Sequence, residues 1–203
     1  MPYSYDVFLS YKRSNEWPKF IGATFLPMFR HWLQAELANP VRIFVDVNEI
    51  ETGEAWPQRL AEGVASSKLM VSLWSREYFV SPWCLAELGH MAARRQSVEP
   101  QSAPPPIIIA VVLHDSESVS PHLRDIQRFN IQEYANPWLA HGSQKAEELS
   151  ELIRTLAHHV RDALERVPEH DAHWSKLAID EFIDLFRSQT GQQGVPSLGS
   201  EAT

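Results

Sequence analysis

The chain has 203 residues, of which 44% are hydrophobic, and this length fits one domain with additions better than two full domains. Its formal net charge of −8 argues against a direct nucleic-acid binder, which would normally carry a basic face. The single cysteine, Cys84, excludes an intrachain disulfide, and the histidines lack the spacing of metal ligands. With no signal-peptide pattern and no window of about 18 apolar residues, we expect a cytoplasmic protein that does not contact a membrane.

Short apolar runs alternate with helical stretches along the chain. Continuous apolar strands are typical of a parallel sheet that is covered on both faces, because both sides of each strand are then buried. With right-handed crossovers, this order predicts an α/β fold with a flavodoxin-like five-stranded parallel sheet and helices on both faces. The expected strands are Tyr5–Tyr11, Val41–Val45, Leu69–Trp74, Ile107–Leu113 and a weaker fifth, Phe129–Tyr134.

Helices are expected between these strands. Apolar residues recur at three-to-four spacing over Phe25–Leu37, where Pro27 predicts a kink or a late start. A second helix covers Trp56–Val64. A third begins at Ser81 and Pro82, an N-cap followed by a proline in the first turn, and runs to Arg95. A long amphipathic helix follows Ser143 and reaches Val167.

Two segments lie outside this plan, so the main domain is expected over residues 1–167. After Pro168, apolar residues at helical spacing over Trp174–Phe186 predict an additional C-terminal helix in residues 168–187. Its apolar face needs cover, from the domain itself or from a partner protein or further domain. Residues 188–203 have no periodicity and are rich in glycine, serine and glutamine, which indicates a flexible tail or linker.

Open α/β sheets bind ligands at the carboxyl ends of their strands, and three loops are expected there. The first, Lys12–Glu16, has no glycine-rich phosphate fingerprint, so neither a dehydrogenase nor a P-loop enzyme is supported. A phosphate could be contacted by Lys12, Arg13 and the hydroxyls of Ser10 and Ser14, although an ordinary solvated turn explains these residues equally well. The second loop, Asp46–Ala55, is long and acidic, and the exposed aliphatic Ile50 beside Gly53 hints at a contact loop.

The third loop, Ser75–Pro82, leads into a helix that carries Trp83 and Glu87. These two residues are four apart, so they share one helix face. A carboxylate at this end of the sheet can line a ligand crevice. A surface ion pair of Glu87 with Arg94 or Arg95 explains the residue as well, and spacing alone favours the ion pair.

Four runs follow one another in the chain: YDVFLSY at Tyr5–Tyr11, FVDVNEIETGEAW at Phe44–Trp56, the segment Ser66–Leu88, and IIIAVVLHDS. In this order they resemble the boxes of the Toll/interleukin-receptor (TIR) domain family, especially its bacterial and plant members that cleave NAD⁺. In that resemblance Ile50 and Gly53 take the apolar and glycine positions of the family's BB loop. The resemblance covers roughly residues 3 to 135. The continuation Lys12–Glu16 departs from the common family variants.

The resemblance implies an enzyme that cleaves the nicotinamide–ribose bond of NAD⁺, with NAD⁺ as substrate and no cofactor or metal. The family's WxxxE position falls on Trp83 and Glu87, which implies that Glu87 is the catalytic residue. A carboxylate near the ribose can stabilise an oxocarbenium-like transition state, and an indole can stack on the nicotinamide. The product would be ADP-ribose or a cyclic variant. The residues expected to bind substrate are Trp83, Ser10, Tyr11, Lys12, Arg13 and Asp46.

The resemblance also implies self-association through TIR–TIR contacts that involve Ile50 and Gly53, and a role in immune or anti-phage defence signalling. In an isolated domain we expect Trp83 and Glu87 to be exposed to water, so that assembly would raise activity by excluding it. Two alternatives stay open. One is a non-enzymatic TIR adaptor, against which the presence of Glu87 argues. The other is a nucleoside deoxyribosyltransferase, which shares a flavodoxin-like sheet and a glutamate near a ribose.

Overall fold

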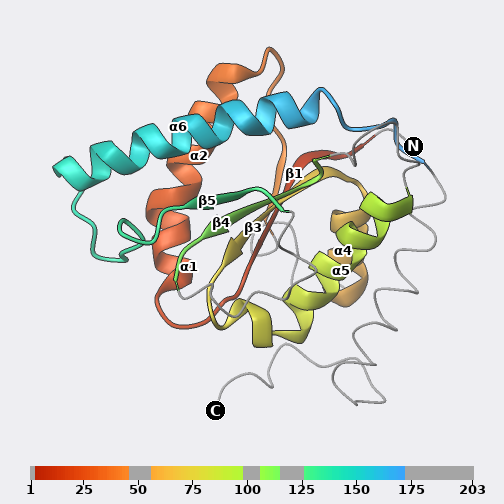
Figure 1. Ribbon diagram of the computed structural model, residues 1–203, viewed down its shortest axis with the longest axis horizontal. Coiled ribbons are helices and arrows are strands. Elements are labelled where there is room, and N and C mark those ends of the chain that lie inside the picture. Colours follow the sequence, from red (N-terminus) through yellow and green to blue (C-terminus); the bar gives the residue numbers. More distant parts are fainter. Residues whose placement is uncertain (1–2, 46–55, 98–105, 115–125, 172–203) are drawn as a thin grey trace.

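The computed structural model describes residues 3–45, 56–97, 106–114 and 126–171. Within these ranges, five parallel strands form one sheet in the order β2-β1-β3-β4-β5 (Figure 1). The predicted flavodoxin-like architecture is therefore confirmed. The strands are β1 (Tyr5–Tyr11), β2 (Ile43–Val45), β3 (Ser67–Trp74), β4 (Ile108–Val112) and β5 (Arg128–Asn130).

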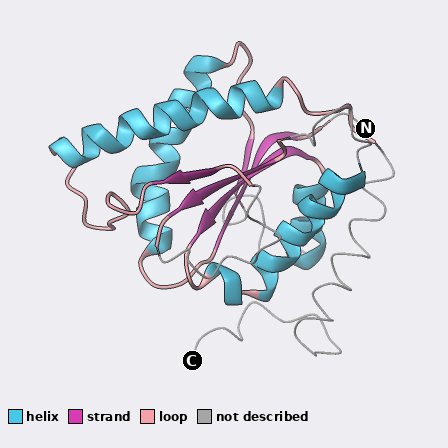
Figure 2. Cartoon of the chain, viewed as in Figure 1, coloured by secondary structure: helices cyan, strands magenta, loops and turns pink. Residues whose placement is uncertain are grey.

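Helices cover both faces of this sheet, as predicted. Figure 2 shows α2 and α6 on one side of the strands and α4 and α5 on the other. The helices of the described residues are α1 (Trp17–Phe20), α2 (Leu26–Glu36), α4 (Trp56–Ala65), α5 (Pro82–Ser97) and α6 (Gln144–Leu164), with a short 3₁₀ turn, η2, at Tyr78–Val80.

The segment between α1 and α2 contains a turn that the helical periodicity did not predict. Ile21–Phe25 forms a π-helix, η1, in which the N–H of Leu26 donates to the carbonyl of Ile21. Pro27 follows in the first turn of α2, where its missing N–H and its ring would disturb a regular α-helix. The wider π turn absorbs that disturbance. At the end of η1 and along α2, three side chains at four-residue spacing are completely buried: Phe25, Phe29 and Leu33.

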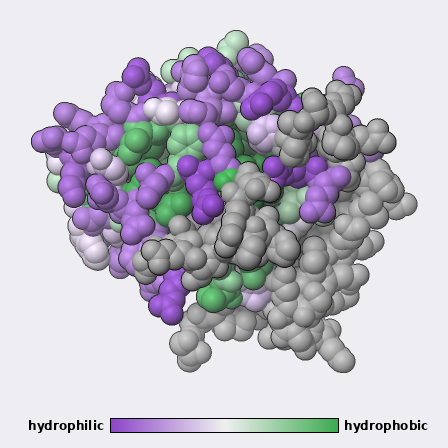
Figure 3. Space-filling model, in the orientation of Figure 1, coloured by the Kyte–Doolittle hydropathy of each residue, from purple (hydrophilic) through white to green (hydrophobic). Residues whose placement is uncertain are grey.

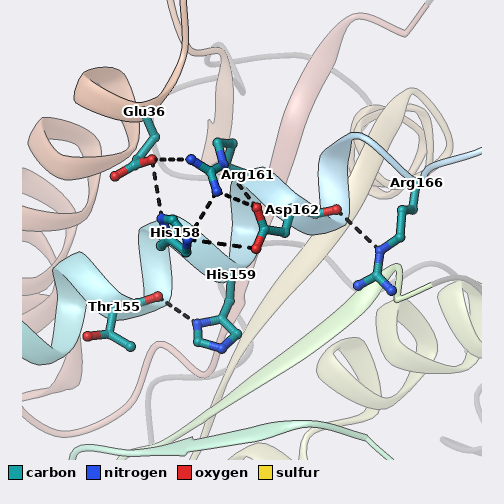
Figure 4. Close-up of polar contacts among 7 residues, drawn as sticks. All are labelled: Glu36, Thr155, His158, His159, Arg161, Asp162 and Arg166. Carbon is teal, nitrogen blue, oxygen red and sulfur yellow. Dashed lines mark hydrogen bonds and ion pairs between the residues drawn. The ribbon is translucent and has the colours of Figure 1, made fainter.

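Helix α6 begins where the sequence placed it, because the Ser143 side chain caps it by accepting a hydrogen bond from the N–H of Ala146. It packs along α2, and the indole of Trp32 donates to the Ser150 hydroxyl at 2.9 Å. Farther along, polar side chains link the two helices (Figure 4). Arg161 and His158 of α6 both reach Glu36 of α2, whereas the neighbouring His159 bonds back to its own helix.

The core lies on both faces of the sheet, with β3 at its centre. Five hydrophobic side chains of β3 have no exposed surface: Leu69, Met70, Val71, Leu73 and Trp74. Over the described residues, the face in Figure 3 is mostly hydrophilic, with hydrophobic residues gathered near its centre. None of the helices in the described ranges is long and apolar enough to cross a membrane.

Several predictions fall on residues that are not described. The loop Asp46–Ala55, with Asp46, Ile50 and Gly53, lies outside the described residues. So do the predicted helix Trp174–Phe186 and the tail at 188–203. The proposed boundary after residue 167 therefore stays a prediction.

Candidate functional site

Helix α5 brings Glu87 to the carboxyl ends of the two central strands. The chain leaves β3 at Trp74, passes through η2 and enters α5 at Pro82 (Figure 1). The predicted cap is confirmed, because the Ser81 hydroxyl accepts from the N–H of Cys84 at 3.5 Å. Glu87 lies in the second turn of this helix, and both of its neighbours, Ala86 and Leu88, are buried as well.

Glu87 is hydrogen-bonded to Ser10, the penultimate residue of β1. The Ser10 hydroxyl donates to Oε2 of Glu87 at 2.5 Å. The hydroxyls of Ser10 and Tyr78 lie 2.8 Å apart, and the Tyr78 hydroxyl also donates to the carbonyl of Cys84 at the longer distance of 3.4 Å. A serine hydroxyl has one proton, which here goes to the carboxylate, so Tyr78 is the donor in its bond with Ser10. Three buried side chains from separate elements thus form a chain of hydrogen bonds that ends on Glu87.

Tyr78 remains a proton donor because of its surroundings. Its ring is completely buried in η2. Burial raises the pKa of the Tyr78 hydroxyl well above its usual value, and the charges of Cys84 and Glu87 raise it further. Hydrogen bonds with serines act in the opposite direction and are outweighed. The phenol therefore stays protonated throughout the physiological pH range.

Two expectations about Glu87 need correction. Its exposed fraction is 5%, so the expectation that it lies open to water in the isolated domain is wrong. The carboxylate turns inward because it bonds to the end of β1. Arg94, one of the two ion-pair partners expected for Glu87, instead donates to the carbonyl of Ser67 at 2.7 Å and to the hydroxyl of Tyr3 at 2.6 Å. These partners lie at the amino end of the sheet.

The other predicted substrate-binding residues of the described ranges gather at the same end of the sheet. Tyr11 is the last residue of β1 and is buried, and Lys12 and Arg13 follow it as half-buried loop residues. Trp83 is half-buried in the first turn of α5. Ser10 also lies at this end, but its hydroxyl is hydrogen-bonded to Glu87 and Tyr78 instead of facing a phosphate site.

The two loops that flank this site are tied to each other. Asn15, after β1, has a left-handed backbone (φ 55°), which asparagine tolerates better than most residues. Its side-chain amide donates to Glu77 at 3.3 Å, directly before η2. Trp17 lies beside His114, which follows β4, with ring centroids 6.4 Å apart. The loops Lys12–Glu16 and Ser75–Pro82 are therefore neighbours, as expected for loops that follow the adjacent strands β1 and β3.

Tyr78 is the residue that sequence reasoning missed. It occupies a short connection between β3 and α5, where no periodicity marks an inward-facing position. The available signal was a tyrosine next to Phe79 in a loop expected at the carboxyl ends of the strands. Among the described residues, no group of three or more histidine, cysteine or acidic side chains is placed to hold a metal ion.

Comparisons with known proteins found a matching family model and similar proteins. A family model described as "TIR domain" matches residues 7–153. The chain is 32% identical over 87 residues to the "Probable disease resistance protein RPP1" of Arabidopsis thaliana, a match that covers 42% of this chain and 7% of that protein. A solved structure of the activated Roq1 resistosome (TIR domains), which directly recognizes the pathogen effector XopQ, aligns with a TM-score of 0.40. That alignment has 20% identity over 89% of this chain and 98% of the other.

Proposed function

Because the chain belongs to the TIR domain family, we propose that it is an NAD⁺ nucleosidase that cleaves the nicotinamide–ribose bond. The observation that carries this proposal is the position of Glu87. Its carboxylate lies at the carboxyl ends of the two central strands, where sheets of this kind bind ligands. The exposed fraction of Glu87 is 5%, and electrostatic interactions are strong at a site that is shielded from water.

The proposed reaction breaks the bond between the nicotinamide nitrogen and the ribose carbon. Nicotinamide leaves as a neutral base and takes the bonding electrons, so positive charge develops on the ribose. The Glu87 carboxylate stabilises that charge and binds the ribose hydroxyls. Water then adds to the ribose carbon and releases a proton, which gives ADP-ribose. Capture by the adenine or by a ribose hydroxyl of the same substrate gives a cyclic product instead.

The remaining residues at this end of the sheet would hold the substrate. The indole of Trp83, one turn before Glu87, would stack on the nicotinamide or pack beside the ribose. Tyr11 would line the crevice, and Lys12 and Arg13 would face the pyrophosphate. Asp46, outside the described residues, is assigned to substrate binding by the family resemblance alone.

The test is to incubate the protein with NAD⁺ at low and high protein concentration and to identify the products by mass spectrometry. We expect nicotinamide together with ADP-ribose or a cyclic variant. Glu87→Gln keeps the shape of the side chain and should lower turnover by roughly a hundred-fold or more. Glu62→Gln, which alters an exposed glutamate paired with Arg59 on α4, is the matched control and should have no effect.

Two results would overturn the proposal. A folded Glu87→Gln protein with undiminished turnover would remove Glu87 from the chemistry. An absence of nicotinamide at every protein concentration would favour the adaptor, a binding module that works through TIR–TIR contacts. Transfer of deoxyribose between a deoxynucleoside and a free base would favour the deoxyribosyltransferase.

We further propose that turnover depends on self-association and serves immune or anti-phage defence signalling. The relative named as a probable disease resistance protein supports the signalling role. Specific activity should rise with protein concentration, because neighbouring copies would complete the crevice that orients the substrate. Ile50→Asp should lower assembly and turnover together. A constant specific activity from a monomer, unchanged by Ile50→Asp, would show that the domain is complete by itself.

A further inference from the structure

We propose that Tyr78 is a positioning residue for Glu87, which it holds in its reactive orientation through the hydroxyl of Ser10. This inference rests on the proposed function, because it concerns the same carboxylate. It assigns Ser10 to the orientation of Glu87 instead of to the binding of a phosphate.

The geometry is a one-way chain of hydrogen bonds between three elements. Tyr78 of η2 donates to Ser10 of β1 at 2.8 Å, and Ser10 donates to Oε2 of Glu87 in α5 at 2.5 Å. The exposed fractions of the three residues are 0%, 1% and 5%, so water does not compete at Tyr78 or Ser10. Hydrogen bonds in a water-poor site polarise one another in series, which strengthens the last bond, the one to Glu87.

The Tyr78 hydroxyl restricts the rotation of the Ser10 hydroxyl. A serine hydroxyl can rotate between three staggered positions, and it donates in only one direction at a time. With the Tyr78 proton directed at its oxygen, the Ser10 proton is left to point at the carboxylate. That bond occupies Oε2 and fixes the rotation of the carboxylate plane. It thereby sets the orientation of the whole carboxylate.

The ring of Tyr78 has a separate role, which makes the hydroxyl testable. The ring is buried and lies edge-on to Phe79, with centroids 5.5 Å apart. Phenylalanine would keep this packing and remove only the donor. Tyr78→Phe therefore separates the proposed positioning role from the apolar contribution of the ring to the fold.

The first experiment measures kcat, KM and the pH profile of NAD⁺ cleavage by the full chain. For Tyr78→Phe we expect kcat to fall on the order of ten-fold, the value of about one hydrogen bond, with little change in KM. The acidic limb of the profile should move to higher pH, because the charged carboxylate loses part of its stabilisation. Ser10→Ala should have the larger effect of the two.

The double variant gives the sharpest result. If Tyr78 acts only through Ser10, the Ser10→Ala/Tyr78→Phe protein should be no slower than Ser10→Ala alone. Two variants serve as matched controls. Tyr3→Phe removes a hydroxyl that accepts a bond from Arg94, which lies on α5 as Glu87 does. Ser67→Ala removes the hydroxyl of a buried serine at the amino end of β3, away from the candidate site. Both controls should keep the kcat and pH profile of the unaltered protein. Additive losses in the double variant, or an unchanged Tyr78→Phe, would overturn the proposal.

A second experiment does not depend on turnover. The carboxyl carbon of Glu87 is followed by NMR in glutamate-labelled protein, and its signal is assigned by its loss in Glu87→Gln. The titration midpoint of this carboxyl should move to higher pH in Tyr78→Phe and stay unchanged in Tyr3→Phe. An unchanged midpoint in Tyr78→Phe would refute the hydrogen-bond chain. A shifted midpoint in a protein that does not cleave NAD⁺ would refute only the proposed function.

Discussion

A buried carboxylate lies at each end of β1, and the two are held in opposite ways. At the amino end, Asp6 accepts from the Lys68 ammonium at 2.8 Å and from the backbone N–H of Arg42 at 3.0 Å. The Arg42 guanidinium adds a second cation 3.7 Å away. At the carboxyl end, Glu87 accepts from the hydroxyl of Ser10.

The difference separates a structural carboxylate from one suited to chemistry. Burial raises the pKa of Asp6, but the bonds and charges of Lys68 and Arg42 outweigh it and hold that pKa below its usual value. These cations neutralise Asp6 and join the starts of three strands. At Glu87 the bond comes instead from the Ser10 hydroxyl, which orients the carboxylate and brings no charge of its own. In the proposed reaction, this carboxylate would face the positive charge that develops on the ribose.

The largest stability effect is expected at the amino end. Asp6→Ala leaves Lys68 and the N–H of Arg42 without their acceptor and should lower the free energy of unfolding by about 3 kcal/mol. Urea unfolding at pH 7 measures this. Because the pKa of Asp6 is lowered in the folded state, its contribution is present above about pH 4 and is lost as the pH falls through the folded-state pKa.

A surface pair provides the control for Asp6. Glu151→Ala removes an ion pair with Arg154 in which both side chains are more than half exposed, and it should change stability by less than about 0.5 kcal/mol. If Asp6→Ala were equally harmless, the contrast between the two ends of β1 would fail.

The next largest effect concerns His90, which lies on α5 between Glu87 and Arg94. Its ring is 6% exposed, and its Nε2 has no hydrogen-bond partner. Burial, together with the charge of Arg94, lowers the pKa of His90 from 6.5 to about 4. The unfolded chain takes up this proton near pH 6.5, so stability falls between pH 6.5 and 4 and the loss levels off below. At pH 5 the loss is about 2 kcal/mol.

Replacing His90 should remove this acid sensitivity. His90→Leu should change stability little at pH 7.5 and make the protein more stable than the unaltered chain at pH 5. Thermal unfolding at the two pH values measures the difference. An identical fall in melting temperature for both proteins would assign the acid sensitivity to other groups.

The smallest expected effect tests the packing of α4 on the sheet. A Cβ at Gly63 would lie 2.6 Å from the ring of Phe44, which is buried and stacked on Phe8. Gly63→Ala gains helix propensity but overpacks the core, so the net destabilisation should be about 1 kcal/mol. Gly22→Ala is the control, since a Cβ there meets nothing within 4 Å. Chemical denaturation should give a lower free energy of unfolding for Gly63→Ala than for Gly22→Ala. Equal values would show that the Phe44 ring moves aside to admit the methyl group.

The sequence predicted the strands and helices that carry a strong pattern. The four apolar runs became β1 to β4 because burial on both faces requires continuous hydrophobic residues. Residues Arg128–Asn130 of β5 are exposed or half-buried at the edge of the sheet, which explains the weakness of that signal. The π turn at Ile21–Phe25 was not predictable from periodicity, since Pro27 is compatible with either a kink or a late start.

The candidate site was predictable only as separate parts. Glu87 and Ser10 were each named, but their contact joins residues 77 positions apart and depends on how α5 packs on β1. Spacing along α5 favoured an ion pair of Glu87 with Arg94 or Arg95, because a local pattern cannot show which way a helix face turns. Tyr78 left no pattern at all, since a three-residue turn has no period to read.

The strand order also determines how this chain can be assembled during synthesis. β1 can pair with β2 once Val45 has been made, but its other neighbour is β3, where Tyr5 pairs with Ser67 and Tyr11 with Leu73. Until the ribosome has added β3, the apolar first strand presents an unpaired edge to the cell. Parallel pairing between distant segments is slow, and open apolar edges are where nascent chains associate wrongly. The same order that makes β1 and β3 the centre of the finished sheet therefore makes the first strand the most vulnerable part of the unfinished chain.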